Sequence, residues 1–240
     1  MVLSATEHGD TMSLSVEVRG LIARYGTRTI LDGVDCTVQA GEVHVILGGS
    51  GSGKSTLLKH MIGLLRPAGG EVRLLGEDLG AAGEQAREQL LTRIGVLFQG
   101  GALLESLDIA GNIALPLTMR HDLPADVIAE LVAMKLELVG LPGKERLYPR
   151  ELSGGMRKRA ALARAIAADP EVLFCDEPGA GLDPISAAAL DDLLLGLRDR
   201  FGMAIVVISH ELTSIRAIAD RITMLDRGKV CAQGSLDRVQ

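Results

Sequence analysis

A glycine-rich run in the first quarter of the chain fits the pattern GxxxxGK[ST] and is followed by Thr56. It lies between an apolar, β-branched stretch and a helical pattern, the context that a phosphate-binding loop (P-loop) requires. Glycines let backbone N–H groups surround phosphate oxygens, and the helix N-terminus adds partial positive charge. Lys54 would reach the β- and γ-phosphates, and Ser55 would ligate Mg²⁺. A glycine-rich turn is the structural alternative. The run consists of Gly48, Gly49, Ser50, Gly51, Ser52, Gly53, Lys54 and Ser55.

Two carboxylates, Asp176 and Glu177, end an apolar stretch later in the chain. Ligands of an open parallel sheet collect at the carboxyl ends of its strands. The pattern is that of a Walker B strand, in which Asp176 holds Mg²⁺ and Glu177 accepts a proton from, or orients, the water that attacks the γ-phosphate. The structural alternative is an acidic helix start, because both residues precede Pro178.

The segment 152–156, with the sequence LSGGM, is a second candidate anion site. Ser153 is suited to the N-cap of a helix, and Gly154 and Gly155 leave backbone N–H groups uncovered. Taken alone, the pattern indicates an ordinary helix start as readily as a phosphate site. The basic residues that follow favour a solvated helix face, with attraction of phosphates as the alternative. They are Arg157, Lys158, Arg159 and, further along, Arg164.

The elements that would position these residues alternate along the chain. Residues 14–39 show the alternating pattern of antiparallel strands with one wet face. Four nearly unbroken apolar runs are typical of parallel strands buried on both faces. Helical patterns separate several of these runs, which favours a doubly wound α/β core. The runs are 43–47, 94–98, 172–175 and 204–208, and the helical patterns are 55–65, 125–139, 154–168, 184–200 and 213–219.

The order of the motifs narrows the interpretation. The P-loop, a lone Gln99 after a strand, LSGGM, the paired carboxylates, Gly181-Leu182-Asp183 and Ser209-His210 follow one another along the chain. Over residues 14–234 this order resembles the ATP-binding cassette of ABC transporters. The resemblance implies ATP and Mg²⁺ as ligands.

The resemblance also implies roles for residues that their chemistry alone leaves open. Tyr25 would stack on adenine, and Gln99 would contact Mg²⁺ or water and link the core to a helical subdomain. His210 would contact the γ-phosphate beside Glu177. Without the resemblance, Tyr25 is read as a core residue and His210 as a structural histidine. Residues of the LSGGM signature and a later aspartate would meet the nucleotide bound by a second copy of the chain: Ser153, Gly154, Gly155 and Asp183.

One departure points to a branch of the family. The signature usually ends in glutamine, whereas Met156 stands here and cannot supply amide hydrogen bonds. LSGGM and the sequences of residues 98–104, 112–117 and 182–185 are similar to the corresponding sequences of ATPases of the Mla and Mce-associated lipid transporters. Only the contact made by the glutamine side chain is put in doubt, because the phosphate clamp rests on Ser153 and backbone groups.

These patterns predict one ABC transporter domain of α/β class, a P-loop NTPase with an N-terminal antiparallel β subdomain and an inserted helical subdomain. Residues 13–98 and 169–240 would form the ATP-binding core with its β subdomain. Residues 99–168 would form the helical, signature-bearing subdomain, and residues 1–12 a disordered N-terminus.

Composition excludes several classes of protein. The net charge is −6, aromatic residues make up 2% of the 240 residues, and tryptophan is absent, which together disfavour nucleic-acid binding. Three widely spaced cysteines indicate neither a disulfide framework nor a zinc site and fit a reducing cytosol. The apolar run 203–208 is far shorter than the roughly 18 residues of a membrane span. The N-terminus lacks the pattern of a signal peptide.

The predicted function is ATP hydrolysis by a bacterial transporter subunit that moves phospholipid or another lipid between envelope membranes. The resemblance implies a homodimer on the cytoplasmic side of the inner membrane, held there by permease subunits, with Mce-type and small accessory subunits as further partners. An ABC ATPase for another cargo, a soluble ABC ATPase and a P-loop kinase are the alternatives.

Residues 99–120 are the predicted docking segment for the permease. Leu103, Leu104, Ile109, Ile113 and Leu115 crowd this segment, which also contains three glycines. We expect it to be poorly suited to a rigid core helix, so that some of its apolar side chains line a groove for a partner helix. Packing of the leucines inside the helical subdomain is the alternative.

Overall fold

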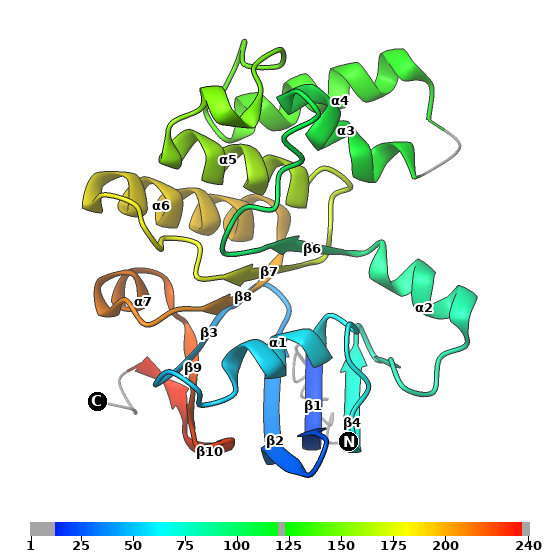
Figure 1. Cartoon of the computed structure of the whole chain (residues 1–240), viewed down its shortest axis with the longest axis vertical. Coiled ribbons are helices and arrows are strands. Elements are labelled where there is room, and N and C mark those ends of the chain that lie inside the picture. The colour runs from blue at the N-terminus through cyan, green and yellow to red at the C-terminus, as the bar shows by residue number, and fades with distance from the viewer. Residues whose placement is uncertain (1–12, 120–122, 237–240) are drawn as a thin grey trace, which may run out of the picture.

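The computed structural model describes residues 13–119 and 123–236 as two β-sheets with helices stacked on them (Figure 1). The predicted disordered segment 1–12 lies outside the described residues. From top to bottom in Figure 1, helices α3 to α5 come first, then α6, strands β6 to β8 of the larger sheet, α1 and the smaller sheet, beside which β9 and β10 of the larger sheet also lie. No helix within the described ranges is long and apolar enough to cross a membrane.

The smaller sheet is antiparallel, as the alternating pattern predicts. Its strand order is β2-β1-β4-β5, and β1 pairs with both β2 and β4. Val16 and Val18 of β1 lie opposite Val38 and Cys36 of β2, and all four are buried. The strands are β1 (Leu14–Tyr25), β2 (Arg28–Gln39), β4 (Gly69–Leu74) and β5 (Glu77–Asp78).

The larger sheet has six strands in the order β10-β9-β3-β8-β7-β6. All neighbouring pairs are parallel except β9 with β10. The four apolar runs of the sequence become β3, β6, β7 and β8, while β9 and β10 escape prediction because polar residues interrupt them. The strands are β3 (Val43–Gly48), β6 (Ile94–Leu97), β7 (Val172–Asp176), β8 (Ala204–Ile208), β9 (Arg221–Asp226) and β10 (Lys229–Ser235).

Five of the helices correspond to predicted patterns, and their ends differ by a few residues. Helix α6 is the clearest, because Asp183 caps its first turn and Gly202 ends it in a left-handed conformation with φ of +63°. The helices are α1 (Lys54–Met61), α2 (Glu84–Leu91), α3 (Ile109–Thr118), α4 (Ala125–Leu138), α5 (Gly154–Ala165), α6 (Pro184–Phe201) and α7 (Leu212–Ile218), with a 3₁₀ turn at Pro149–Glu151.

Helix α3 corrects the expectation that the glycine-rich docking segment avoids a core helix. Ile109, Ile113 and Leu117 recur every four residues on one face and are buried. Asp108 caps the helix by accepting a hydrogen bond from the Gly111 N–H at 2.7 Å. The burial of this stripe outweighs the low helix propensity of one glycine and one proline. Ile109 and Ile113 therefore belong to the core and cannot line a docking groove.

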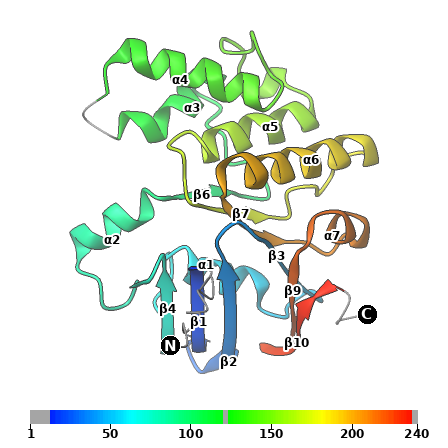
Figure 2. The same cartoon turned by 180° about the vertical axis from the view of Figure 1, so that it is seen from behind.

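Two hydrophobic clusters hold the layers together, one on each face of the larger sheet. Side chains of β7 alternate between them, since Leu173 and Cys175 join the cluster under the helices while Val172 and Phe174 join the cluster above the smaller sheet. Seen from behind, α6 lies between the sheet and helices α3 to α5 (Figure 2). The predicted division of the chain at residues 98/99 and 168/169 stays a prediction.

Candidate active site

The P-loop connects the end of β3 to the start of α1, and two of its glycines are required by close contacts. Gly48 has φ of +154°, and a Cβ atom there would lie 2.3 Å from the Leu225 carbonyl oxygen. Gly53 has φ of +109°, and its Cβ would lie 2.5 Å from the Leu31 side chain. No other residue fits these positions without displacing the loop, so the glycine pattern has a direct steric cause.

Lys54 lies across this loop. Its ammonium Nζ donates to the carbonyl oxygens of Gly48 at 2.7 Å and Gly49 at 3.0 Å. Helix α1 begins without a side-chain cap and has no acidic residue in its first turn. Cβ atoms built at Gly49 and Gly51 would meet nothing within 4 Å. The loop therefore presents uncapped N–H groups and one cation to open space, which is the chemistry of an anion site.

The remaining P-loop residues divide by exposure. Ser50 and Ser55 are exposed, whereas Ser52 is buried and its hydroxyl has no hydrogen-bond partner among the residues that the structure describes. The Ser52 N–H donates to the Gly49 carbonyl at 3.2 Å inside the turn. Ser52 thus shapes the loop from within, and Thr56, in the first turn of α1, is half-buried.

Asp176 and Glu177 lie at the carboxyl end of β7, beside the end of β8. Glu177 has φ of +46°, and its N–H donates to the Ile208 carbonyl at 2.9 Å. Burial raises the pKa of Asp176 and the neighbouring Glu177 raises it further, while the ammonium groups of Lys59 and Lys54 oppose this change. A cation at this position would therefore stabilise the ionised form of Asp176.

Three of the predicted catalytic side chains meet at one carboxylate. The Gln99 amide Nε2 donates to Glu177 Oε2 at 2.9 Å, and His210 Nδ1 lies 3.1 Å from Glu177 Oε1. Gln99 follows β6 and His210 follows β8, so three neighbouring strands of the larger sheet deliver these groups. The acidic helix start does not account for this arrangement, because Glu177 lies well before α6.

Ser153 and Asp183 are both helix caps. Ser153 Oγ accepts from the Met156 N–H at 3.3 Å, and Asp183 accepts from the N–H of Ser186 at 3.0 Å. Hydrogen bonds from Ser186 also lower the pKa of Asp183. A Cβ at Gly155 would lie 3.3 Å from Ser186 Oγ, so the signature adjoins the start of α6.

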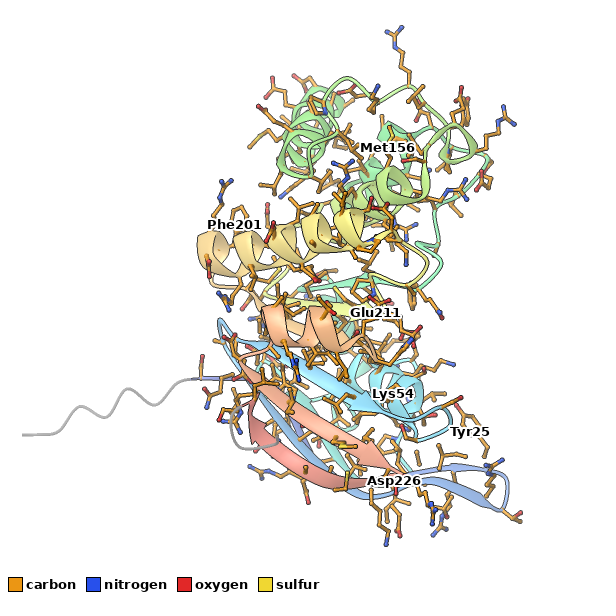
Figure 3. The ribbon with its side chains drawn as sticks, turned by 90° about the vertical axis from the view of Figure 1, so that its left-hand side faces the viewer. Tyr25, Lys54, Met156, Phe201, Glu211 and Asp226 are labelled. Carbon is orange, nitrogen blue, oxygen red and sulfur yellow. The ribbon has the colours of Figure 1, made fainter. Side chains whose placement is uncertain are left out.

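The signature and the P-loop share no polar contact among the described residues of one chain. Within the part of the chain that the structure describes, no hydrogen bond or ion pair joins residues 153–155 to residues 48–56. Tyr25, half-exposed at the end of β1, lies on the same side of the molecule as Lys54 and Met156 (Figure 3). All these groups are thus open to a ligand or a second molecule approaching from that side.

A hollow of about 890 Å³ lies away from these groups, between the start of β1, α4 and the end of α6. Leu14, Met134 and Phe201 contribute to its wall, and Figure 3 shows Phe201 on the side opposite Lys54. Its two lining cations already have carboxylate partners, Arg93 with Glu171 and Lys135 with Asp169. The hollow therefore offers no chemistry that matches the motifs.

Lys158 and Arg164 have a place in the site that differs from the one the sequence predicts for the basic cluster. Both belong to α5, but Lys158 is buried and Arg164 half-buried, contrary to the expectation of a solvated face. They bind backbone carbonyls of the loop that contains Gln99. The run Ala160 to Ala163 around them is entirely apolar and indicates a helix buried on most sides, which is the signal that could have revealed them.

Comparisons with known proteins agree with this geometry. The family model described as ABC transporter matches residues 31–180. The chain is 42% identical over 223 residues to the probable ribonucleotide transport ATP-binding protein mkl of Mycobacterium tuberculosis, covering 93% of this chain. It spans only 62% of the length of that relative. It is 40% identical to the intermembrane phospholipid transport system ATP-binding protein MlaF of Escherichia coli, covering 94% of this chain and 84% of MlaF.

Solved structures are similar over nearly the whole chain. The cbiO1 protein of Clostridium perfringens, part of the transporter complex cbiONQ, superposes with a TM-score of 0.87 at 28% identity and covers 95% of this chain and 90% of its own. The ABC transporter cassette MJ0796 in its dimeric structure superposes with a TM-score of 0.85 at 28% identity, covering 92% and 98%. These findings confirm the predicted fold class. The chain therefore belongs to the ABC transporter family, as an ATP-binding cassette.

Proposed function

We propose that this chain hydrolyses ATP as one half of a dimer and thereby powers a membrane transporter. The observation that carries the proposal is the Glu177 carboxylate, held by Gln99 and His210 at the sheet edge to which the P-loop also belongs. MJ0796 in a post-hydrolysis state bound to ADP and Pi shares this fold with a TM-score of 0.84 at 28% identity, over 92% of this chain and 98% of its own. P-loop kinases offer no use for the signature segment.

The site suits Mg²⁺ as a cofactor. Mg²⁺ keeps several waters and is bound by one or two carboxylates together with substrate phosphates. No cluster of three or more His, Cys, Asp or Glu side chains that could hold a metal occurs among residues 13–119 and 123–236, and the Asp176 carboxylate lies close enough to Lys54 for the ammonium to lower its pKa. Ser55, Asp176 and Gln99 would hold the ion, which when bound would neutralise phosphate charge.

Each protein group has a role that follows from its chemistry. Lys54, no longer occupied by loop carbonyls, would bind the β- and γ-phosphates. Glu177 would take the proton of the attacking water, and His210 would hold the carboxylate and contact the γ-phosphate. Tyr25, exposed beside the loop, would stack on the adenine.

Two copies of the chain would complete each site. Ser153 is the N-cap of α5, and Gly154 and Gly155 are its first residues, whose N–H groups have no partner within the helix. An anion bound to the P-loop of a second copy would satisfy them. The dimeric structure of MJ0796 supports this arrangement, in which Asp183 would lie at the seam.

Phospholipid is the proposed cargo, moved through permease subunits on the inner face of the membrane. The name of MlaF supports this cargo, and so does the LSGGM sequence, which resembles that of the lipid-transporter ATPases. A nucleotide cargo is the second candidate, because the relative mkl is named for ribonucleotide transport. Purification of the tagged chain from its native membrane, followed by identification of bound proteins and lipids, separates the two: phospholipid together with an Mce-type subunit favours the first candidate.

The permease is proposed to dock on the exposed apolar residues of segment 103–119. Leu104 is 43% exposed, Leu115 40% and Met119 74%. Leu104→Glu should therefore leave ATP binding and thermal stability nearly unchanged but abolish co-purification with the permease. Met134→Glu, at a more exposed apolar residue (62%) beside the hollow, is the control. A lower melting temperature with retained membrane association would contradict the docking role.

Glu177→Gln tests the central proposal. The amide keeps the shape of the side chain but cannot take a proton, so the complex should bind ATP and hydrolyse it about 10² to 10⁴ times more slowly. An ATP-bound dimer should accumulate and be visible by size measurement. Glu171→Gln, at the other end of the same strand region and paired with Arg93, should hydrolyse at the normal rate. A normal rate in Glu177→Gln would contradict the proposal.

Mixed dimers test whether the signature acts on the partner's nucleotide. A Ser153→Arg chain paired with a Lys54→Ala chain should leave one composite site intact and one doubly damaged. If each signature served its own P-loop, both sites would be damaged once. Equal residual ATP binding at both sites would therefore refute the composite arrangement.

A further inference from the structure

The loop that carries Gln99 is bound along the signature helix α5. Lys158 lies in the second turn of this helix and is only 8% exposed. Its ammonium donates to the Gln99 carbonyl and lies 3.4 Å from the Glu177 carbonyl oxygen. One buried cation thus contacts the backbone of both the predicted glutamine and the predicted base.

A buried ammonium needs such partners, since an unpaired charge is costly inside a protein. Burial lowers the pKa of Lys158, and the nearby carboxylates of Asp176, Glu177 and Glu211 act in the opposite direction. The carbonyls of Gln99 and Glu177 accept hydrogen bonds from the Lys158 ammonium, which the acidic side chains do not. The position of Lys158 is therefore fixed by several groups at once, and so is the position of the backbone it contacts.

Arg164 binds the same loop further along α5. Its guanidinium donates to the carbonyls of Ala102 at 2.6 Å and Gly101 at 2.9 Å. Between the two cations, Ala161 approaches so closely that a Cβ on Gly101 would lie 3.2 Å from it. Gly101 and Ala102 have φ of +74° and +51°, a conformation that directs both carbonyls to one partner. Lys158, Ala161 and Arg164 form one contact strip for residues 99–102.

We propose that Lys158 and Arg164 are positioning residues that bind the Gln99–Ala102 loop to the signature helix, so that displacement of the helix displaces the Gln99 amide relative to Glu177. The inference rests on the proposed function, in which Glu177 is the base. A displacement of Ser153–Gly155, at the start of the same helix, would then change the position of the Gln99 amide, which lies 2.9 Å from the Glu177 carboxylate. Closure of the dimer on ATP would adjust the base through this connection.

A double-mutant cycle distinguishes positioning from general support of the fold. Lys158→Met keeps the length of the side chain and removes the ammonium. In the complex purified from its native membrane, it should lower kcat for ATP hydrolysis about tenfold or more and change KM less than about threefold. Because Lys158 acts through Gln99, adding Lys158→Met to Gln99→Ala should cause no further loss.

Lys135→Met is the matched control, since Lys135 is a buried lysine of the same helical region that contacts Asp169 instead. It should change stability but not kcat. Equal kcat in Lys158→Met and Lys135→Met, or losses that multiply in the double variant, would overturn the inference. An inactive wild-type complex would instead contradict the proposed function.

Arg164→Lys tests the same loop with a measurement that does not require ATP hydrolysis and with a variant that removes no buried charge. Lysine keeps the charge but cannot donate to two carbonyls in a fork. Amide hydrogen exchange of residues 100–104 should become faster in the full chain, while exchange in α6 stays unchanged. Unchanged exchange in residues 100–104 would overturn the inference even if Lys158→Met failed to fold.

Discussion

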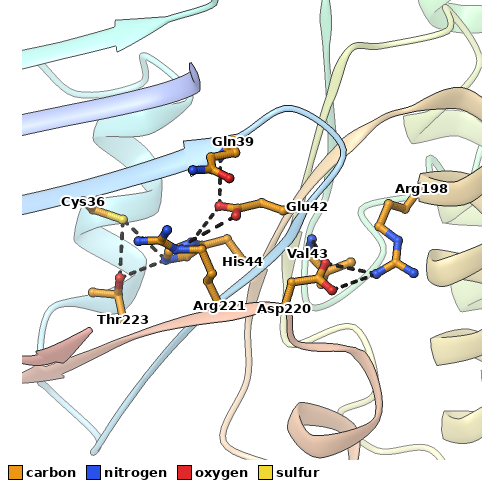
Figure 4. A network of polar contacts seen from close by, with 9 residues as sticks. All are labelled: Cys36, Gln39, Glu42, Val43, His44, Arg198, Asp220, Arg221 and Thr223. Atoms are coloured by element: carbon orange, nitrogen blue, oxygen red, sulfur yellow. Dashed lines mark hydrogen bonds and ion pairs between the residues drawn. The ribbon is translucent and has the colours of Figure 1, made fainter. Parts of the chain in front are cut away.

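The stability of this cassette should fall between neutral and alkaline pH because of one buried histidine. His44 of β3 is fully buried between β2 and β9 (Figure 4). Its Nδ1 lies 3.2 Å from Glu42 Oε1 and its Nε2 lies 2.8 Å from Thr223 Oγ1. Both ring nitrogens thus face an oxygen acceptor, which suits the doubly protonated imidazolium. Cys36 Sγ lies 3.7 Å from Nε2.

The size of the effect follows from the pKa. Burial alone lowers the pKa of His44, but hydrogen bonds with Cys36 and Glu42 outweigh it and raise the pKa from 6.5 to about 9. Because the folded value exceeds the unfolded one, the stabilisation is complete below pH 6.5 and is lost as pH rises through 9. At about 1.4 kcal/mol per pH unit, this amounts to about 3 kcal/mol.

Denaturant unfolding at several values between pH 6 and pH 9.5 measures this loss. Glu42 is also contacted by the Gln39 N–H at 2.8 Å and by Arg221 Nε at 4.0 Å, and Glu42→Gln replaces the carboxylate beside His44 with a neutral amide. The free-energy difference between wild type and Glu42→Gln should shrink as pH rises over this range, by less than about 3 kcal/mol because Cys36 also raises the pKa of His44.

A matched control is His60→Gln. His60 is buried too, but its Nδ1 contacts the Thr56 carbonyl at 2.7 Å instead of a carboxylate. This variant should keep the pH dependence of the wild type. A wild-type unfolding free energy that stays constant from pH 6.5 to 9.5, or a difference from Glu42→Gln that does not change with pH, would refute the reasoning.

Three further predictions concern other parts of the chain. Asn112→Ala removes four hydrogen bonds between a fully buried amide and the backbone of residues 104–108. It should lower the free energy of unfolding by about 2–4 kcal/mol and the melting temperature by about 4–16 °C. Thr118→Ala removes one exposed hydrogen bond and should lower the free energy of unfolding by less than about 0.5 kcal/mol. Gly48→Ala forces a Cβ to within 2.3 Å of a carbonyl oxygen of β9 and should lower the melting temperature by several degrees, while Gly49→Ala meets nothing within 4 Å and should not. A maleimide should label Cys231, which is exposed, in the native protein and all three cysteines after denaturation; labelling of the two buried ones without denaturant would contradict the described packing.

Much of the fold could be predicted because its strands are buried on both faces. An unbroken apolar run such as 204–208 has the same meaning in any context, and the structure places β8 over those five residues. Strand β9 contains arginine, threonine and aspartate, so its sequence pattern cannot be distinguished from that of a loop. Helix α3 was hidden by its glycine and proline, although a stripe with a spacing of four was present.

The site was predicted unevenly for a similar reason. The P-loop and the paired carboxylates are contiguous, so their chemistry can be read from neighbouring residues. Gln99 and His210 approach Glu177 only because three separate strands end at one edge, and the family resemblance alone indicated them. Lys158 contacts backbone carbonyls, and every residue has a carbonyl, so no residue type in the sequence identifies its partners.

The alternation of β7 side chains between two hydrophobic clusters has a mechanical consequence. Strands β7 and β8 each contribute to both clusters, so neither cluster can lose its packing without exposing one face of these strands. Heating should therefore produce a single calorimetric transition for the described layers, despite their division into sheets and helices. Asp176 and Glu177 end a strand that is clamped from above and below. The strand backbone that carries both carboxylates should therefore hold its position when α5 is displaced.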